Sequence, residues 1–173
     1  MALSKIDAVN FLTGTIPQGN VANASLGAVT ALPAAIATGR VLQVVYAVST
    51  TEVASTNTTW QDIVSASITP SATSSKVLVL GAPGGLIKSG GDTQLNLRLL
   101  RDSTQIAETK GLNTGSSLQL FVPGAPLNEL DEPSSTSSLT YKIQIQNRDS
   151  NGTVTASQNN ADSSLTLLEI DGS

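Results

Sequence analysis

The sequence predicts an all-β protein: a two-sheet antiparallel β-sandwich with jelly-roll-like connections, preceded by an extended N-terminal arm. From Arg40 onward, short runs with apolar residues at every second position end in clusters of Ser, Thr, Gly, Asn or Pro, which is typical of short strands. No helical segment of useful length separates these runs, so the parallel α/β classes are excluded. An immunoglobulin-like sandwich is the alternative. Because residues 1–39 show no sustained period, we assign them to the arm and residues 40–173 to the β-sandwich domain.

The β-sandwich domain contains eight to ten predicted strands. The segment Lys76–Ala82 has apolar residues at both its odd and its even positions, which indicates a central strand. In the first strand the alternation places four apolar side chains on one face, namely Leu42, Val44, Tyr46 and Val48. The predicted strands cover residues 40–49, 59–69, 76–82, 94–101, 104–110, 118–122, 127–130, 139–146, 153–157 and 164–170.

Turn signals separate the predicted strands. Asp102-Ser103 predicts a tight hairpin, and Asp149–Gly152 predicts a turn. The glycine-rich stretch Gly81–Gly91 predicts a loop between strands. It is not expected to bind phosphate, because it lacks the Gly-Lys-Ser/Thr ending and no helix follows it.

The arm is more apolar than a solvated tail. Ser4 could cap a short helix with Asp7 at its third position, and Gly14 and Pro17 would stop a longer one. An apolar segment of this kind usually lies against a partner, although a disordered tail is the alternative. The residues expected to anchor the arm are Leu3, Ile6, Val9, Phe11, Leu12 and Ile16.

The composition argues against several functions. The net charge is −4 and the basic residues are scattered, so nucleic acid is not an expected partner. No apolar stretch is long enough to span a bilayer, and the N-terminus does not match a secretory signal. Without His or Cys, a Ser-His-Asp triad, a Cys nucleophile and a His-based zinc site are impossible. We therefore expect no enzyme activity, no cofactor and no metal.

Two sets of acidic or amide side chains could still support other chemistry. Glycoside hydrolysis needs paired carboxylates, and calcium needs oxygen ligands. In both cases the simpler interpretation, a solvated acidic loop or an ordinary turn, is favoured. The carboxylate candidates are Glu129, Asp131 and Glu132, and the calcium candidates are Asp149, Asn151 and Asp162.

Trp60 and Tyr46 could stack on a glycan, but aromatic residues in alternating strands are more often part of a core. Polar loops could also contact a glycan at the distal end of the domain. The candidates there are Asp92, Asn113, Asp149 and Asn151.

Five segments in a fixed order resemble a β-sandwich domain of structural proteins from marine and freshwater phages, especially cyanophages. They are GRVLQVVYAVST, SITPSATSSKVLVLGAPGG, LRLLRDSTQIA, LDEPSSTSSLTYKIQIQ and SSLTLLEID. The opening MALSKIDAVNFLTGTIPQGNV is also similar to the start of such proteins. The resemblance covers nearly the whole chain and implies a virion protein that forms homotrimers. In tail fibres the domain usually follows a long shaft, whereas here only about 39 residues precede it.

Two functions follow as expectations. The first is a small trimeric capsid decoration (cement) protein on the outer surface of the virion, fastened to the major capsid protein or another virion protein by residues 1–39. The second is a short tail-fibre subunit or fibre tip that binds a host surface glycan. The number of copies per virion distinguishes them, because a decoration protein covers the shell and a fibre is present in few copies.

Overall fold

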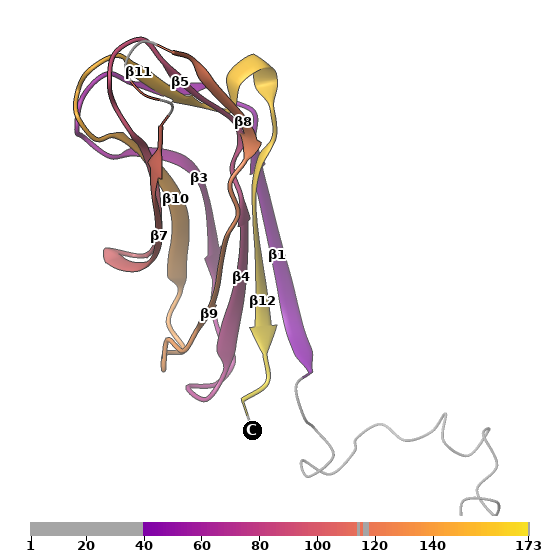
Figure 1. Cartoon of the computed structure of the whole chain (residues 1–173). Helices are drawn as coiled ribbons and strands as arrows, with labels where there is room; N and C mark the ends of the chain where they lie inside the picture. The colour runs from indigo at the N-terminus through magenta and orange to yellow at the C-terminus, as the bar shows by residue number, and fades with distance from the viewer. Residues whose placement is uncertain (1–39, 114, 116–117, 173) are drawn as a thin grey trace, which may run out of the picture. The chain divides into compact units, whose positions relative to one another are not determined.

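The computed structural model describes residues 40–113, 115 and 118–172 (Figure 1). The described residues form strands and one short 3₁₀ turn, η3 (Gln158–Asn160), so the all-β prediction is confirmed. None of the helical structure in these residues has the length and apolar character needed to cross a bilayer. The strands are β1 (Val41–Ser49), β2 (Val53–Ser55), β3 (Gln61–Ile68), β4 (Lys76–Ala82), β5 (Gly84–Ser89), β6 (Leu95–Arg101), β7 (Thr104–Leu112), β8 (Leu120–Gly124), β9 (Leu127–Asp131), β10 (Leu139–Asn147), β11 (Thr153–Ala156) and β12 (Ser163–Ile170).

Eight of these strands form two antiparallel four-stranded sheets that face each other (Figure 1). The β1 sheet has the order β1-β12-β4-β9, and the β3 sheet has the order β3-β10-β6-β7. Successive strands therefore cross repeatedly between the sheets, and the first and last lie side by side. This is the jelly-roll arrangement. It differs from the immunoglobulin order, so the predicted jelly-roll connections are confirmed and the immunoglobulin-like alternative is wrong.

A third sheet closes one end of the sandwich, which the two-sheet prediction did not include. This end sheet has the order β2-β11-β5-β8, and Figure 1 shows it at the end opposite the C-terminus. Its strands continue the long ones, since only Pro83 separates β5 from β4 and only Ala125-Pro126 separates β8 from β9. The end sheet raises the strand count of the described residues above the predicted eight to ten, and its three-residue β2 was not predicted.

The prediction of a loop over Gly81–Gly91 was wrong, because most of this stretch is β5. β5 pairs with β11 and β8. Its first glycine is required by a close backbone approach: a Cβ on Gly84 would lie 2.3 Å from the carbonyl oxygen of Asp162. Glycine here marks a tight contact between two segments of backbone.

The core lies between the β1 sheet and the β3 sheet and extends under the end sheet. Tyr141, Ile143 and Ile145 of β10 are fully buried, which confirms the inward alternation predicted for this strand. The aliphatic composition of the chain is reflected in the core, which includes Ile63, Ile68, Val77, Val79, Leu86, Leu95, Leu97, Leu99, Leu127, Val154, Leu165 and Leu167.

The apolar face predicted for β1 points away from this core. Val45 and Ala47 pack against the core, whereas Val44, Tyr46 and Val48 are exposed. The assignment of Tyr46 to a core was therefore wrong. Because apolar residues occupy both odd and even positions of β1, the alternation alone does not distinguish its inner face from its outer face.

Two turns confirm their sequence signals. The hairpin between β6 and β7 turns at Asp102, which has a positive φ of 51°. Ser150 and Gly152 also adopt positive φ, of 53° and 84°, in the turn that joins β10 to β11. The six predicted anchor residues, Leu3, Ile6, Val9, Phe11, Leu12 and Ile16, lie outside the described residues.

Candidate interaction surface

The outer surface of the β1 sheet carries apolar side chains across all four strands, and we call it the apolar face. In an antiparallel sheet, directly paired residues point to the same side. One row runs from β1 to β9 as Val44, Leu168, Leu78 and Leu130, and the next as Tyr46, Thr166, Leu80 and Asn128. Four of these side chains are well exposed: Tyr46 at 62%, Val44 at 59%, Leu130 at 49% and Leu80 at 40%.

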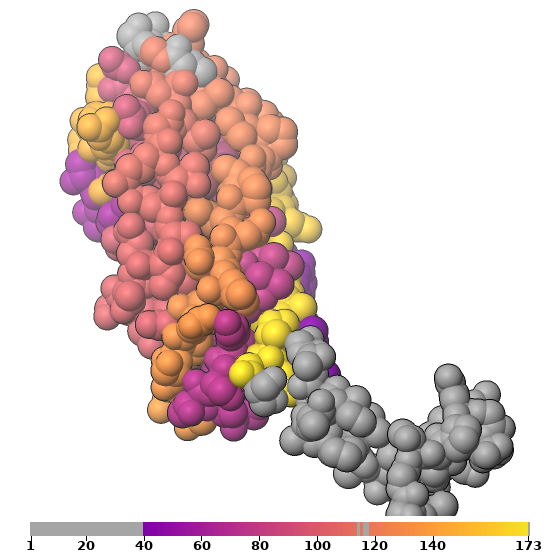
Figure 2. Space-filling view, turned by 60° about the horizontal axis from the view of Figure 1, so that its bottom comes forward, coloured from indigo at the N-terminus to yellow at the C-terminus, as the bar shows by residue number. Residues whose placement is uncertain are grey.

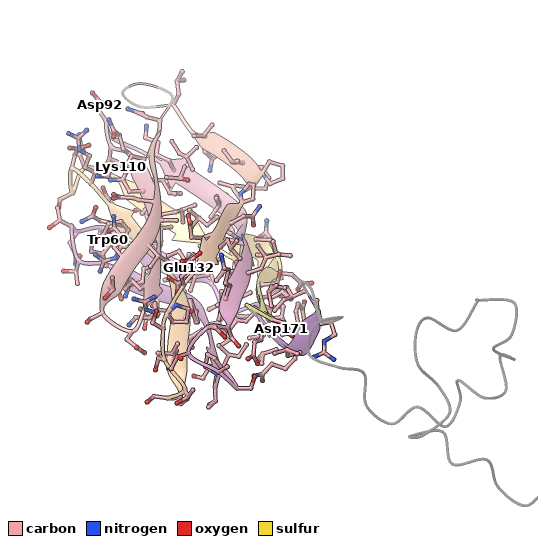
Figure 3. The ribbon with its side chains drawn as sticks, turned by 90° about the horizontal axis from the view of Figure 1, so that it is seen from below. Trp60, Asp92, Lys110, Glu132 and Asp171 are labelled. Carbon is pink, nitrogen blue, oxygen red and sulfur yellow. The ribbon has the colours of Figure 1, made fainter. Side chains whose placement is uncertain are left out.

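Charged side chains occur at one end of the apolar face, where they form ion pairs with each other. Lys76 Nζ lies 2.6 Å from Glu132 Oε1, and Arg40 Nη2 lies 3.3 Å from Asp171 Oδ2. Figure 3 labels Glu132 and Asp171, the acidic members of these pairs. The two apolar rows contain no charged side chain, so the middle of the face offers nothing that would attract an ionic partner.

The outer surface of the β3 sheet has the opposite character. Ser67 and Thr140 are hydrogen-bonded through their hydroxyls at 2.9 Å. Further along the sheet, Gln144 accepts a hydrogen bond from Arg98 Nε at 2.7 Å and donates one to Asp62. Such a polar, mutually bonded surface is compatible with water, so the two outer surfaces of one sandwich differ sharply.

Trp60, which Figure 3 labels, immediately precedes β3 and is half-buried. The Arg98 guanidinium lies 4.2 Å from the centre of its ring, a distance suited to a cation–π interaction. This ring face is therefore already occupied by a protein side chain, which weighs against Trp60 as a stacking platform for a glycan.

The connection between β3 and β4 is fixed to β12 by Glu169, which is 1% exposed. Its carboxylate accepts hydrogen bonds from Ser71 N at 2.7 Å, Ser71 Oγ at 2.6 Å, Ser75 Oγ at 2.7 Å and Gln43 Nε2 at 2.6 Å. Burial raises the pKa of Glu169, but these hydrogen bonds together outweigh it and lower the pKa to about 2. A buried carboxylate with this many donors is a structural anchor.

The predicted acidic loop beside Pro133 is more structured than expected. Asp131, at the end of β9, is buried and joins the two main sheets. It accepts bonds of 2.7 and 2.8 Å from Arg101 Nη1 and one of 2.6 Å from the Tyr141 hydroxyl. Burial, followed by the bond to Asp131, raises the pKa of Tyr141. The hydrogen bond to Asp131 raises the pKa of Arg101.

This geometry contradicts the solvated interpretation for Asp131. It also removes Asp131 from the candidate catalytic pair, because both carboxylate oxygens have structural partners. Glu132 pairs with Lys76, and Glu129 is half-buried on the edge strand β9. The three carboxylates therefore do not converge on a common site.

The distal loop residues are brought together at the end of the domain next to the end sheet. Asn113 Nδ2 donates to Asp92 Oδ1 at 3.2 Å, and the Asp149 amide donates to Thr93 Oγ1 at 3.2 Å. Gly91 lies so close to Asn151 that a Cβ would fall 2.3 Å from its Oδ1. The clustering of the four predicted residues is therefore real, although some of their polar atoms bind each other. Within the described part of the chain, no group of three or more His, Cys, Asp or Glu side chains is arranged to hold a metal ion.

The apolar face is the candidate site that the sequence interpretation missed. The sequence does contain a signal for this face. In β1 and β4 apolar residues occupy both odd and even positions, and β12 carries Leu165, Leu167 and Leu168. In a two-layer sandwich only one face of each sheet meets the core. A sheet with several strands apolar on both faces therefore has a second apolar surface that requires a cover.

No protein-family model matches the chain, and no curated protein sequence matches it either. Among solved structures, the VP2 subviral particle of infectious bursal disease virus aligns over 75% of this chain and 33% of its own, at 12% identity and a TM-score of 0.46. The Gx strain of that virus aligns over 76% and 38%, at 12% identity and a TM-score of 0.39. The Gt strain aligns over 76% and 37%, at 15% identity and a TM-score of 0.35.

The chain thus spans little more than a third of the length of these viral chains. Since every TM-score is below 0.5, the function of those proteins does not transfer to this one.

Proposed function

We propose that this chain is a structural protein of a bacteriophage virion, a small capsid decoration protein on the outer surface of the shell. The observation that carries the proposal is the contrast between the two outer surfaces of the jelly roll, one apolar and one polar. The largest apolar patch on a soluble domain is often its functional surface. A subunit built for assembly covers one surface with protein and turns the other to water.

The phage origin and the trimeric state come from the resemblance of the five sequence segments. Residues 1–39 would fasten the subunit to the major capsid protein or another virion protein, with Leu3, Ile6, Val9, Phe11, Leu12 and Ile16 as anchors. Apolar side chains buried between shell subunits would add about 1.5–3 kcal/mol each. A role without catalysis agrees with the use of Asp131 and Glu169 as structural anchors.

A cryo-EM reconstruction of the intact virion tests this proposal. We expect density for the jelly roll repeated over the capsomers, with residues 1–39 continuing onto the shell.

A second experiment measures the binding of the full chain and of its Phe11→Asp variant to purified shells, with Phe121→Asp as the control. Phe121 is an exposed residue of β8, so its substitution should leave shell binding intact. Density confined to the tail, or equal binding of both variants, contradicts the proposal.

The alternative function, a short tail-fibre tip that binds a host glycan, is favoured by one observation. Asp92, Asn113, Asp149 and Asn151 lie together at one end of the domain. The reconstruction separates the two functions, because a fibre tip would appear in few copies at the tail with this end pointing outward.

A further inference from the structure

We propose that the apolar face of the β1 sheet is a self-association surface that packs against a second copy of this chain. The inference deepens the proposed function by assigning the surface that the copies share. It rests on that function only in its expectation of a repeating assembly, because the residues that carry it are all in the described domain.

The chemistry of the apolar face favours a second copy of the chain as its occupant. The two central rows carry Val44, Leu168, Leu78 and Leu130, then Tyr46, Thr166, Leu80 and Asn128, with no charge. The charged groups at the end of the face already pair with one another. A partner that binds here must therefore present an uncharged, largely apolar surface, which the same face of another copy provides through a two-fold contact that joins copies, or trimers, in pairs.

The apolar face is large enough to form the main part of an interface between subunits. Four strands about 4.8 Å apart, each about seven residues long at 3.3 Å per residue, give the whole outer surface of the sheet, its charged end included, an area on the order of 450 Å². This lies within the range of about 300–600 Å² found for the largest patches on monomers, which are often functional. It supplies more than half of the roughly 800 Å² that each partner contributes to a stable interface.

The open edge of β1 and the groove beside it can supply the remaining area of such an interface. β1 forms a ladder with β12 alone among the described strands, so its other edge is open. Beside it lies a groove of about 290 Å³ between Ala47–Ser49 of β1 and Asp62–Ser65 of β3. The groove is continuous with the apolar face through Val48. Figure 2 shows the opposite side of the domain, where β7 and β9 lie next to each other.

The time at which a partner becomes available also favours a second copy of the chain. An apolar face of this size would promote aggregation if it remained open after synthesis. Other copies of the same chain are present from the start of synthesis, whereas a different partner must first be encountered. Self-association therefore covers the face at the stage when protection is needed.

Sedimentation or light scattering on the full-length protein tests the inference. We expect a mass that is an even multiple of 17.7 kDa, because a two-fold contact joins copies in pairs. We expect Val44→Lys to raise the concentration for half-dissociation by at least about tenfold, as for a residue at the centre of an interface. Val44 is solvent-exposed within one subunit, so its replacement should not unfold the domain. Ser67→Lys is the matched control, since Ser67 is an exposed outward residue of β3, an edge strand of the opposite sheet.

A labelling experiment locates the contact independently. Because the chain contains no cysteine, Thr166→Cys and Thr140→Cys each introduce a single thiol. Both threonines are half-buried outward residues, one on the β1 sheet and one on the β3 sheet. In the assembled protein we expect maleimide to react with Cys at position 166 at least about tenfold more slowly than at position 140, because interface cores exclude water. In the Val44→Lys background the two rates should become similar.

Three results overturn the inference. One is a monomeric wild-type protein with position 166 freely reactive. Another is a monomer with position 166 protected, which would mean that residues 1–39 cover the face. The third is an oligomer that Val44→Lys leaves unchanged. Each result is separable from the proposed function, because the location of the chain in the virion is read from the reconstruction and not from these measurements.

Discussion

At the scale of single residues, Glu169 makes the stability of the domain dependent on pH. The pKa of this buried carboxylate is about 2 in the folded protein, below its ordinary value of 4.5. A carboxyl group with a lowered folded pKa stabilises the folded state above its unfolded pKa, and this contribution is lost as the pH falls through the folded value. We therefore expect Glu169 to contribute about 3 kcal/mol at pH 7, lost between about pH 4.5 and pH 2.

The variant Glu169→Gln tests this expectation. At pH 7 it should lower the free energy of unfolding by roughly 1–3 kcal/mol, because an amide cannot accept all the hydrogen bonds from Ser71, Ser75 and Gln43. It should also flatten the fall in stability between pH 4.5 and pH 2. Urea unfolding at several pH values and one protein concentration measures both effects. Glu132→Gln is the control, since the Glu132 side chain is 65% exposed, and an equal effect of the two substitutions would contradict the assigned role of Glu169.

At the scale of elements, β5 depends on a glycine that allows two backbone segments to approach closely. The Gly84 amide donates to Ser163 Oγ at 3.0 Å, and its carbonyl accepts from the Ser157 amide at 2.8 Å. A methyl group there would collide with the Asp162 carbonyl. We expect Gly84→Ala to destabilise the domain by about 1–3 kcal/mol, as overpacking does.

Gly90→Ala serves as the comparison for Gly84→Ala. Gly90 has a positive φ of 64°, but the nearest atom to an added Cβ is 3.7 Å away. Its replacement therefore costs only the strain of placing an L side chain in the left-handed region, about 1 kcal/mol. Thermal unfolding of both variants separates the two causes. If Gly84→Ala proves no more harmful than Gly90→Ala, the close approach of β5 to Asp162 is not a constraint on the fold.

Strands with one apolar face were predictable from the sequence together with their orientation. For strands with two apolar faces the strand was predictable but its orientation was not, and a strand without an apolar face was not predictable. β6 and β10 alternate clearly, because Leu97, Leu99, Ile143 and Ile145 face the core while polar residues separate them. β5 begins with glycines that have no side chain to mark a face. For β1 the strand was predictable, but its orientation was not, since Val45 and Tyr46 are both apolar and only the pairing with β12 decides which points inward.

The candidate site was harder to predict for a related reason. Residues 1–39, to which the sequence assigns the anchoring function, lie outside the described residues. The apolar face arises from the register of β1, β12, β4 and β9, which brings residues from position 44 to position 168 into one row. The alternation in the sequence shows which residues of a strand share a face, but it does not show which strands lie beside that strand.

At the scale of the whole molecule, self-association through the apolar face would link folding stability to protein concentration. A partner that binds only the folded chain stabilises it by mass action. We expect the unfolding temperature of the wild type to rise by about 2–4 °C for each tenfold increase in concentration. Val44→Lys should unfold at a temperature that does not depend on concentration, because the association that supplies the linkage is lost.

Differential scanning calorimetry across a hundredfold range of protein concentration provides the test, with Ser67→Lys as the matched control on the polar surface. At low concentration, where the wild type is dissociated, all three proteins should unfold at similar temperatures, since Val44 and Ser67 are both exposed on the single subunit. Divergence only at high concentration would show that the face stabilises the assembly and not the fold. If Val44→Lys is already less stable at the lowest concentration, this side chain supports the subunit itself, and the cover of the apolar face must belong to the same chain.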